Sequence, residues 1–318
     1  MTPAHLLTWD ALRASAQRGK RFSDLDGLPL WPEDDPFDDW SAYAAYCIDV
    51  ARAVGQGLAP LPVELAYHAR VLENEVFEET TRHLVLPKKI FNEKNRPFSW
   101  SYTALEQFQN CPNQYAEHRF FCNIPFEETD YIRWGNEVHK AMEDRIRHGK
   151  PLPDSMKQWE KFPKTLEAAA VKHGGDLTAE QEMTLTRHFT PCGWFDNKAF
   201  VRSKVDAIIK NENTMWLYDW KTGKTRHKPL QLLIFAVKAA VMNPEIDHFK
   251  TRYIWLSTGE VTGEDYHRSN LVELFKPVLR DVARMQRAWQ TRNFQCRTSG
   301  LCRGWCQVTD CVHWEPKR

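Results

Sequence analysis

The sequence predicts an α/β fold in which a mixed sheet is flanked by helices. Two β-rich runs, residues 199–210 and 216–221, are joined by a short connection that begins with Asn-Glu-Asn at residues 211–213, a sequence typical of a hairpin turn. An apolar helix is expected over residues 229–242, and a further buried strand over residues 251–257. Folds that combine strands and helices in this way usually keep their functional sites at strand ends.

Further elements are expected on either side of these runs. Residues 99–112 place Ser and Thr caps before an apolar-periodic helix that a final proline stops or restarts. Residues 129–148 carry a strong helical periodicity, and residues 157–172 are typical of a surface helix. Residues 182–189 alternate as a strand, and residues 270–290 predict a long closing helix.

The length of 318 residues fits one large core with an appended unit, since a domain typically takes about 100–200 residues. We expect an accessory, mainly helical region at residues 1–95, to which the sequence assigns no chemistry. The α/β core should occupy residues 96–292. A cysteine-rich tail that binds a metal or a cluster should occupy residues 293–318.

Charge and hydropathy limit the possible partners. Lys and Arg total 43 against 42 for Asp and Glu, a formal net charge of +1, so no overall basic field indicates nucleic acid. DNA binding would depend on a local cluster, and the densest is Lys221, Lys224, Arg226, His227 and Lys228. No run approaches the roughly 18 apolar residues of a membrane span, and residues 1–20 lack a signal-peptide core. We therefore expect a soluble, cytoplasmic protein without a membrane partner.

A carboxylate and an ammonium group are predicted to share one small space. Because side chains alternate along a strand, Asp219 and Lys221 point to the same face. Asp206 on the neighbouring strand would bring a second carboxylate, and two converging carboxylates repel unless a cation lies between them. Oxygen ligands and a nearby lysine suit Mg²⁺ or Mn²⁺ and the hydrolysis of phosphodiesters. An isolated Asp-x-Lys is nevertheless common on amphipathic strands, so this pair is weak support by itself.

Four elements in order give the pattern its specificity. They are His139 at the end of Gly135-Asn136-Glu137-Val138-His139, then Asp206, then Asp219-Trp220-Lys221, then Gln231 with Phe235 four places later. This order resembles the RecB-like branch of the PD-(D/E)xK nuclease superfamily, in which position 235 usually carries Tyr. The resemblance implies a restriction-endonuclease-like core. Phe235 keeps the ring and lacks the hydroxyl, which puts any hydrogen bond made by that oxygen in doubt.

The resemblance also implies roles for these residues. His139, Asp206, Asp219 and the backbone carbonyl of Trp220 would hold Mg²⁺ or Mn²⁺. Lys221 would orient the attacking water or stabilise charge on the phosphate, acting with Asp219 and Asp206 as catalytic residues. Gln231 would position water or the DNA backbone.

The implied activity is that of a DNA nuclease. It would act as an exonuclease on single strands or free ends, in recombination, repair or replication. Two alternatives remain open at this point. One is a catalytically silent subunit with a nuclease fold that binds DNA or acts as a scaffold. The other is a zinc-stabilised adaptor that acts through residues 1–95 and the tail.

The cysteine-rich tail allows two ligand sets, since soft thiolates favour zinc or iron–sulfur groups. A local set of Cys296, Cys302, Cys306 and Cys311 would bind Zn²⁺, with His313 in reserve. A long-range set of Cys111, Cys302, Cys306 and Cys311 resembles the [4Fe-4S] staple of AddB-type proteins and CRISPR-adaptation nucleases. The tail spacing is C-x3-C-x4-C, whereas that family usually has C-x2-C-x5-C. Free thiols are the third possibility.

Overall fold

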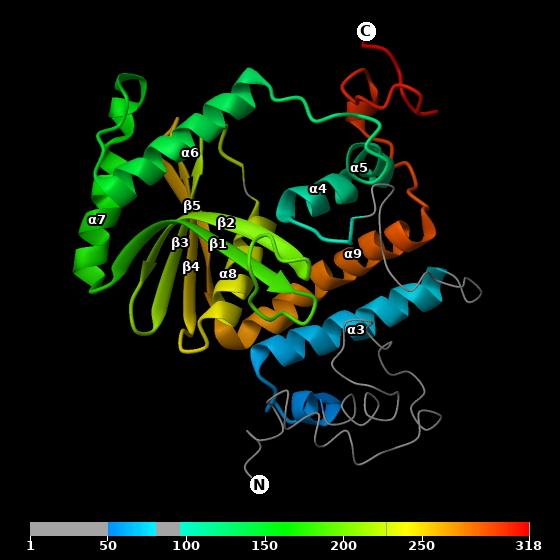
Figure 1. Cartoon of the computed structure of the whole chain (residues 1–318), viewed down its shortest axis with the longest axis horizontal. Coiled ribbons are helices and arrows are strands. Elements are labelled where there is room, and N and C mark those ends of the chain that lie inside the picture. Colours follow the sequence, from blue (N-terminus) through cyan, green and yellow to red (C-terminus); the bar gives the residue numbers. More distant parts are fainter. Residues whose placement is uncertain (1–49, 81–95, 227, 318) are drawn as a thin grey trace. The chain divides into compact units, whose positions relative to one another are not determined.

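The computed structural model describes residues 50–80, 96–226 and 228–317 (Figure 1). Most of the predicted accessory region, and His227 of the predicted basic cluster, therefore lie outside the described residues. The described part of the accessory region includes helix α3 (Leu61–Thr80), in agreement with its predicted helical character. The division into three segments at residues 95 and 292 stays a prediction.

A five-stranded mixed sheet forms the centre of the fold, which confirms the predicted α/β class. The strands lie in the order of the sequence, and all neighbours are antiparallel except β3 and β4, which are parallel. Helix α8 (Pro229–Met242) provides the crossover that a parallel pair requires. The strands are β1 (Asp176–Thr186), β2 (Ala199–Lys210), β3 (Thr214–Lys221), β4 (His248–Trp255) and β5 (Glu260–His267).

Capping residues begin the helices that precede the sheet. Ser101 caps helix α4, where its hydroxyl accepts a hydrogen bond from Ala104 N at 3.3 Å, and Thr129 caps helix α6 through Ile132 N, also at 3.3 Å. The helices are α4 (Tyr102–Asn110), α5 (Pro112–Arg119), α6 (Asp130–His148), α7 (Lys161–His173) and α9 (Leu271–Thr291), with short 3-10 turns at Asp154–Trp159, Arg268–Asn270 and Gly300–Cys302.

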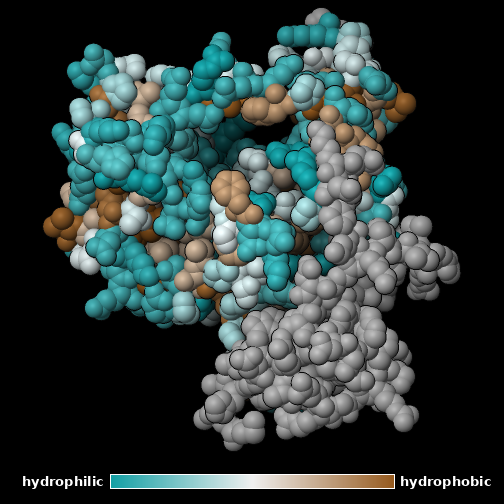
Figure 2. All heavy atoms as spheres, viewed as in Figure 1, coloured by the Kyte–Doolittle hydropathy of each residue, from teal (hydrophilic) through white to brown (hydrophobic). Residues whose placement is uncertain are grey.

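The chain divides into two compact units. One consists of residues 126–186 and 190–275 and contains the sheet; the other consists of residues 1–125, 187–189 and 276–318. Among the described helices, none combines the length and apolar character required to cross a membrane. On the face shown in Figure 2, polar residues cover most of the described surface and hydrophobic ones are scattered among them.

Helices cover both faces of the sheet. Tyr218 and Trp220 of β3 belong to an apolar cluster that includes Val138 and Met142 of α6 and residues of α7. Asp219, which lies between them in the strand, is hydrogen bonded to Gln231 of α8. Because successive side chains of a strand point to opposite faces, α8 covers the face opposite to that cluster. Its residues 232–241 are all buried, and all of them except Lys238 are apolar.

Strand β1 differs from its predicted range, and strand β5 was missed. Residues 182–189 were expected to form a strand, but β1 begins at Asp176 and ends at Thr186. Its first half alternates polar and charged residues around few apolar ones, so the pairing with β2 extends further than the local pattern indicates. Strand β5 was not predicted, because its burial pattern leaves nearly every residue exposed or half-buried.

Candidate functional site

Three carboxylates form a row across strands β1, β2 and β3. Ala179 pairs with Ala207 and Gln181 with Val205, which places Glu180 opposite Asp206. The pairing of Ala207 with Tyr218, continued by one residue, places Asp206 opposite Asp219. Asp206 is 5 % exposed and Asp219 4 % exposed. Three acids this close and this well buried favour a cation among them.

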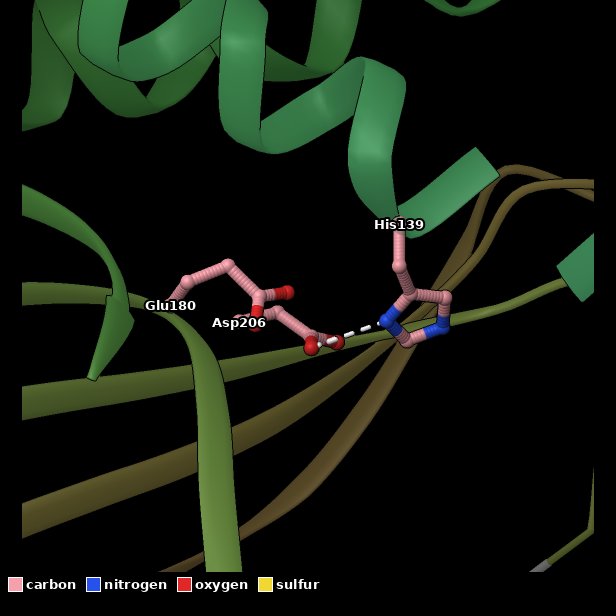
Figure 3. A group of neighbouring side chains, drawn as sticks. All are labelled: His139, Glu180 and Asp206. Atoms are coloured by element: carbon pink, nitrogen blue, oxygen red, sulfur yellow. Dashed lines mark hydrogen bonds and ion pairs between the residues drawn. The ribbon is translucent and has the colours of Figure 1, made fainter. Parts of the chain in front are cut away.

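His139 completes one side of this row. Its Nδ1 lies 2.9 Å from Asp206 Oδ1, and the other oxygen of Asp206 accepts a hydrogen bond from Trp220 N at 2.7 Å. Figure 3 shows the His139 ring and the carboxylates of Glu180 and Asp206 pointing toward one another from α6, β1 and β2. One ligand atom from each of these three residues lies within 4.8 Å of the other two. In the described part of the chain, this is the set of three potential ligands that satisfies that distance.

The other side of the row is a network around Asp219. Lys221 Nζ lies 2.5 Å from Asp219 Oδ2 and donates to Gln231 Oε1 at 3.2 Å. Gln231 Nε2 in turn donates to Asp219 Oδ1 at 3.1 Å. The hydroxyl of Tyr253 lies 3.0 Å from Gln231 Oε1 and 2.9 Å from the carbonyl of Lys228. These contacts orient the ammonium group of Lys221 beside the carboxylates.

Burial and mutual repulsion control protonation here. Burial and the charge of Asp219 raise the pKa of Asp206. Burial and the charge of Asp206 likewise raise the pKa of Glu180. Burial would lower the pKa of His139, but the hydrogen bond to Asp206 and the charges of Asp206 and Asp219 outweigh it and raise that pKa to about 9. A divalent cation at this place would compete with that proton, because a metal ligand must be deprotonated.

One buried oxygen supports the suitability of the site for a metal ion. Asp219 Oδ2 is fully buried and makes no hydrogen bond within the described structure, although it forms the ion pair with Lys221. A carboxylate oxygen can accept more than one partner, so Oδ2, whose partner is the Lys221 ammonium group, can accept a further ligand. Imidazole nitrogen and carboxylate oxygen form a donor set that Mg²⁺ and Mn²⁺ accept.

The structure thus brings together His139 with Asp206, and Asp219 with Lys221 and Gln231, at one end of the sheet. Phe235 is buried, and the hydroxyl near Gln231 comes from Tyr253 of β4. Of the predicted basic cluster, Lys224 and Arg226 are exposed in the segment that follows β3.

Sequence reasoning missed Glu180 and Tyr253. Glu180 lies before the predicted start of its strand, and its position opposite Asp206 depends on the pairing of β1 with β2. Tyr253 was placed in a buried strand, but its approach to Gln231 depends on the parallel pairing of β3 with β4, in which Asp219 and Tyr253 are partners. The local signal that could have found Glu180 is the pattern at every second residue formed by Leu177, Ala179, Gln181 and Met183. This pattern would have indicated an earlier start of β1, with Glu180 inside the strand.

A second cluster of potential ligands lies in the other unit. Five cysteines line one pocket, so both predicted ligand sets occur at the same place. The sulfurs of Cys296 and Cys311 are 3.5 Å apart. Burial and the neighbouring Cys311 raise the pKa of Cys296 to about 11, and burial also raises the pKa of Cys306. The five are Cys111, Cys296, Cys302, Cys306 and Cys311, and His313 also lines the pocket.

Backbone amides of the tail point at two of these sulfurs. Arg297 N donates to Cys111 Sγ at 3.4 Å, and Ser299 N donates to Cys302 Sγ at 3.5 Å. Amide donors of this kind stabilise the negative charge of thiolates and of sulfur ligands.

Comparison with known proteins identifies a family to which the chain is similar. A family model described as the PD-(D/E)XK nuclease superfamily matches residues 99–311. No curated protein matches the chain. Among solved structures, one titled "Crystal structure of SSO0001" is similar over 77 % of this chain and 96 % of that chain, at 14 % sequence identity and a TM-score of 0.36. A TM-score of that size supports no argument, so the family model alone carries the relationship.

Proposed function

Because the chain belongs to the PD-(D/E)XK nuclease superfamily, we propose that it is a Mg²⁺- or Mn²⁺-dependent deoxyribonuclease that acts on single strands or free DNA ends. Membership of the superfamily implies a metal-dependent nuclease. The DNA substrate, the preference for its ends and the roles of individual residues are proposed here. The observation that supports it best is the row of buried carboxylates between His139 and Lys221.

The proposed ligands of the divalent ion are His139, Asp206, Asp219 and the backbone carbonyl of Trp220. When bound, such an ion polarises the scissile phosphate and makes a water molecule more acidic. Asp206 is held for this role by Trp220 N and His139, which engage its two oxygens from different elements. Asp219 is held by Gln231 on one oxygen and by Lys221 near the other.

Lys221 is the proposed catalytic cation. Its side chain is 28 % exposed, so it can reach a substrate while it remains beside Asp219. From there it can orient the attacking water or stabilise the charge that develops on phosphate oxygens. Gln231 accepts from Lys221 and donates to Asp219, so it fixes both groups and is proposed to position water or the DNA backbone.

The preference for DNA strands with ends depends on the resemblance to RecB-like nucleases and on local charge. Lys224 and Arg226 are exposed directly after the strand that carries Lys221, where a phosphate backbone would approach the carboxylates. Exonuclease action in recombination, repair or replication is part of the same proposal. The formal net charge of +1 makes this local cluster the main source of attraction for DNA.

For the cysteine pocket we propose a [4Fe-4S] cluster held by Cys111, Cys302, Cys306 and Cys311. A single Zn²⁺ with Zn–S distances of about 2.3 Å would hold its sulfurs about 3.8 Å apart. The 3.5 Å between the sulfurs of Cys296 and Cys311 is near that spacing, whereas the presence of Cys111 in the same pocket, with Arg297 N donating to its sulfur, supports the long-range set. Zn²⁺ held by Cys296, Cys302, Cys306 and Cys311 is the alternative.

Cleavage of end-labelled single-stranded and of circular DNA tests the proposed activity. With Mn²⁺ present, Asp219→Ala and Lys221→Ala should each lower the rate about 100-fold or more, and Lys164→Met on the exposed side of α7 should not. Circular dichroism should show that all three variants are folded. Binding of single-stranded DNA by the native protein without cleavage would instead support the catalytically silent DNA-binding subunit. Unchanged turnover in Lys221→Ala would remove the proposed mechanism.

A further inference from the structure

We propose that Glu180 is an additional ligand of the metal ion that His139 and Asp206 hold. This inference rests on the proposed metal-dependent function and deepens it, because Glu180 belongs to none of the motif residues. It assigns a third carboxylate, from β1, to a centre whose motif carboxylates come from β2 and β3.

Glu180 lies close to both His139 and Asp206. A ligand oxygen of Glu180 lies within 4.8 Å of the ligand atoms of both His139 and Asp206 (Figure 3). Two ligands at opposite sides of one ion are about 4.2 Å apart when each bond is about 2.1 Å, so small side-chain movements suffice to close on a common ion. Within the described residues, the set that meets this distance consists of His139, Glu180 and Asp206, and Asp219 adjoins it on the side of Lys221.

The backbone of Glu180 is strained. Its φ is +50°, in the left-handed region, although it lies inside strand β1 and is not glycine. A residue with a side chain rarely adopts this conformation. It occurs at the point of the strand that faces Asp206, and the Glu180 side chain is only 9 % exposed.

Arg147 holds the backbone on both sides of the Ala179–Glu180 peptide bond. Arg147 donates from Nε and Nη2 to the carbonyl of Ala179 at 3.2 and 2.7 Å, and from Nη2 to the carbonyl of Glu180 at 3.1 Å. Arg147 lies on α6 eight residues after His139, which is about two helical turns. One rigid helix therefore fixes both the imidazole and the backbone that carries Glu180.

The charges around Glu180 favour a cation. Lys204 Nζ lies 3.1 Å from it and is 45 % exposed, so water screens this ion pair. The carboxylates of Asp206 and Glu143 also act on Glu180, and Glu143 is itself paired with Lys140 and Arg147. A divalent ion that displaces the proton of His139 would replace its charge and offset the repulsion between Glu180 and Asp206.

Mn²⁺ binding to the full-length protein without DNA tests the inference. We expect Glu180→Gln to raise the Mn²⁺ dissociation constant about tenfold or more, measured by calorimetry or by the electron paramagnetic resonance of free Mn²⁺. Glu182→Gln is the matched control, because Glu182 lies two residues along the same strand and is exposed. That control should bind Mn²⁺ as the native protein does.

Glu180→Gly separates a ligand from a structural residue. Glycine accepts a positive φ without strain, so this variant should melt at the same temperature as the native protein or higher. It should nevertheless lose as much Mn²⁺ affinity as Glu180→Gln. If Glu180 were only structural, affinity would be kept in the variant whose stability is kept.

The outcomes distinguish the two proposals. Native affinity within twofold in both Glu180 variants, or no Mn²⁺ binding by the native protein, would overturn the assignment of Glu180. Weakened Mn²⁺ binding in those variants, combined with a native protein that cleaves no DNA, would support Glu180 as a ligand and reject the nuclease proposal alone.

Discussion

The imidazole Nδ1 of His139 lies 2.9 Å from Oδ1 of Asp206, although 67 positions separate the two residues in the chain. The contact joins helix α6 to strand β2, and it favours the protonated form of His139 in the folded state. The same pair is where the proposed metal ion would displace that proton.

Stability without metal should therefore depend on pH through His139. Folding raises its pKa from about 6.5 to about 9, so the folded state binds more protons between these values. The contribution is fully present below pH 6.5 and is lost as the pH rises through about 9. Since the ring is 32 % exposed, we expect about 1 to 2 kcal/mol. Urea unfolding in EDTA at pH 6 and pH 9.5 measures the difference in the free energy of unfolding between the two pH values. His139→Gln should make this difference smaller. An equal difference in the variant and the native protein would show that His139 is not its source.

Lys238 is expected to destabilise the fold. It is 1 % exposed, and its Nζ donates only to the carbonyl of Val201 at 3.3 Å and to Ser203 Oγ at 2.8 Å, which are both neutral. Burial lowers its pKa well below the usual value, so stability falls as the pH decreases below about 10. Lys238→Met should raise the free energy of unfolding by about 1 to 3 kcal/mol at pH 7, and by less at pH 10.

The exposed Lys172 of α7 provides the control for this change. Lys172→Met should leave the free energy of unfolding within about 0.5 kcal/mol of the native value at both pH values. A Lys238→Met variant that is less stable than the native protein at pH 7 would show that its two hydrogen bonds outweigh the cost of burial.

Tyr253 is expected to act on catalysis through Gln231. Its hydroxyl lies 3.0 Å from Gln231 Oε1 in a chain whose position 235 carries phenylalanine. Tyr253→Phe should lower kcat about fivefold, the factor that corresponds to one hydrogen bond of about 1 kcal/mol. The Mn²⁺ dissociation constant should stay unchanged, because the hydroxyl contacts none of the proposed ligands. Loss of Mn²⁺ affinity with unchanged kcat would place its effect on the metal instead.

The cysteine pocket can be tested by paired variants. Cys111→Ser should remove the iron and the visible absorption expected of an iron–sulfur cluster and should lower the melting temperature. Cys122→Ser should change neither, because Cys122 does not line the pocket. If Cys296→Ser releases zinc while Cys111→Ser keeps it, the local zinc set is correct and the cluster is not.

Local patterns in the sequence determined much of this fold. Strand β2 and helix α8 occupy the ranges that were predicted, residues 199–210 and 229–242. Their apolar runs and their Pro and Asn boundaries depend on neighbouring residues alone. The order of His139, Asp206, Asp219 and Lys221 could likewise be recognised in the sequence, because a motif consists of residue types at given positions along the chain.

Only the tertiary structure decided which distant groups meet. Strand register placed Glu180 opposite Asp206 and Tyr253 beside Asp219. A one-residue shift in either pairing would have turned those side chains to the other face, and no local periodicity specifies that choice. The meeting of the tail cysteines with Cys111 in one pocket is also long-range. It depends on how the tail packs against the residues around Cys111, and not on the spacing of the cysteines within the tail.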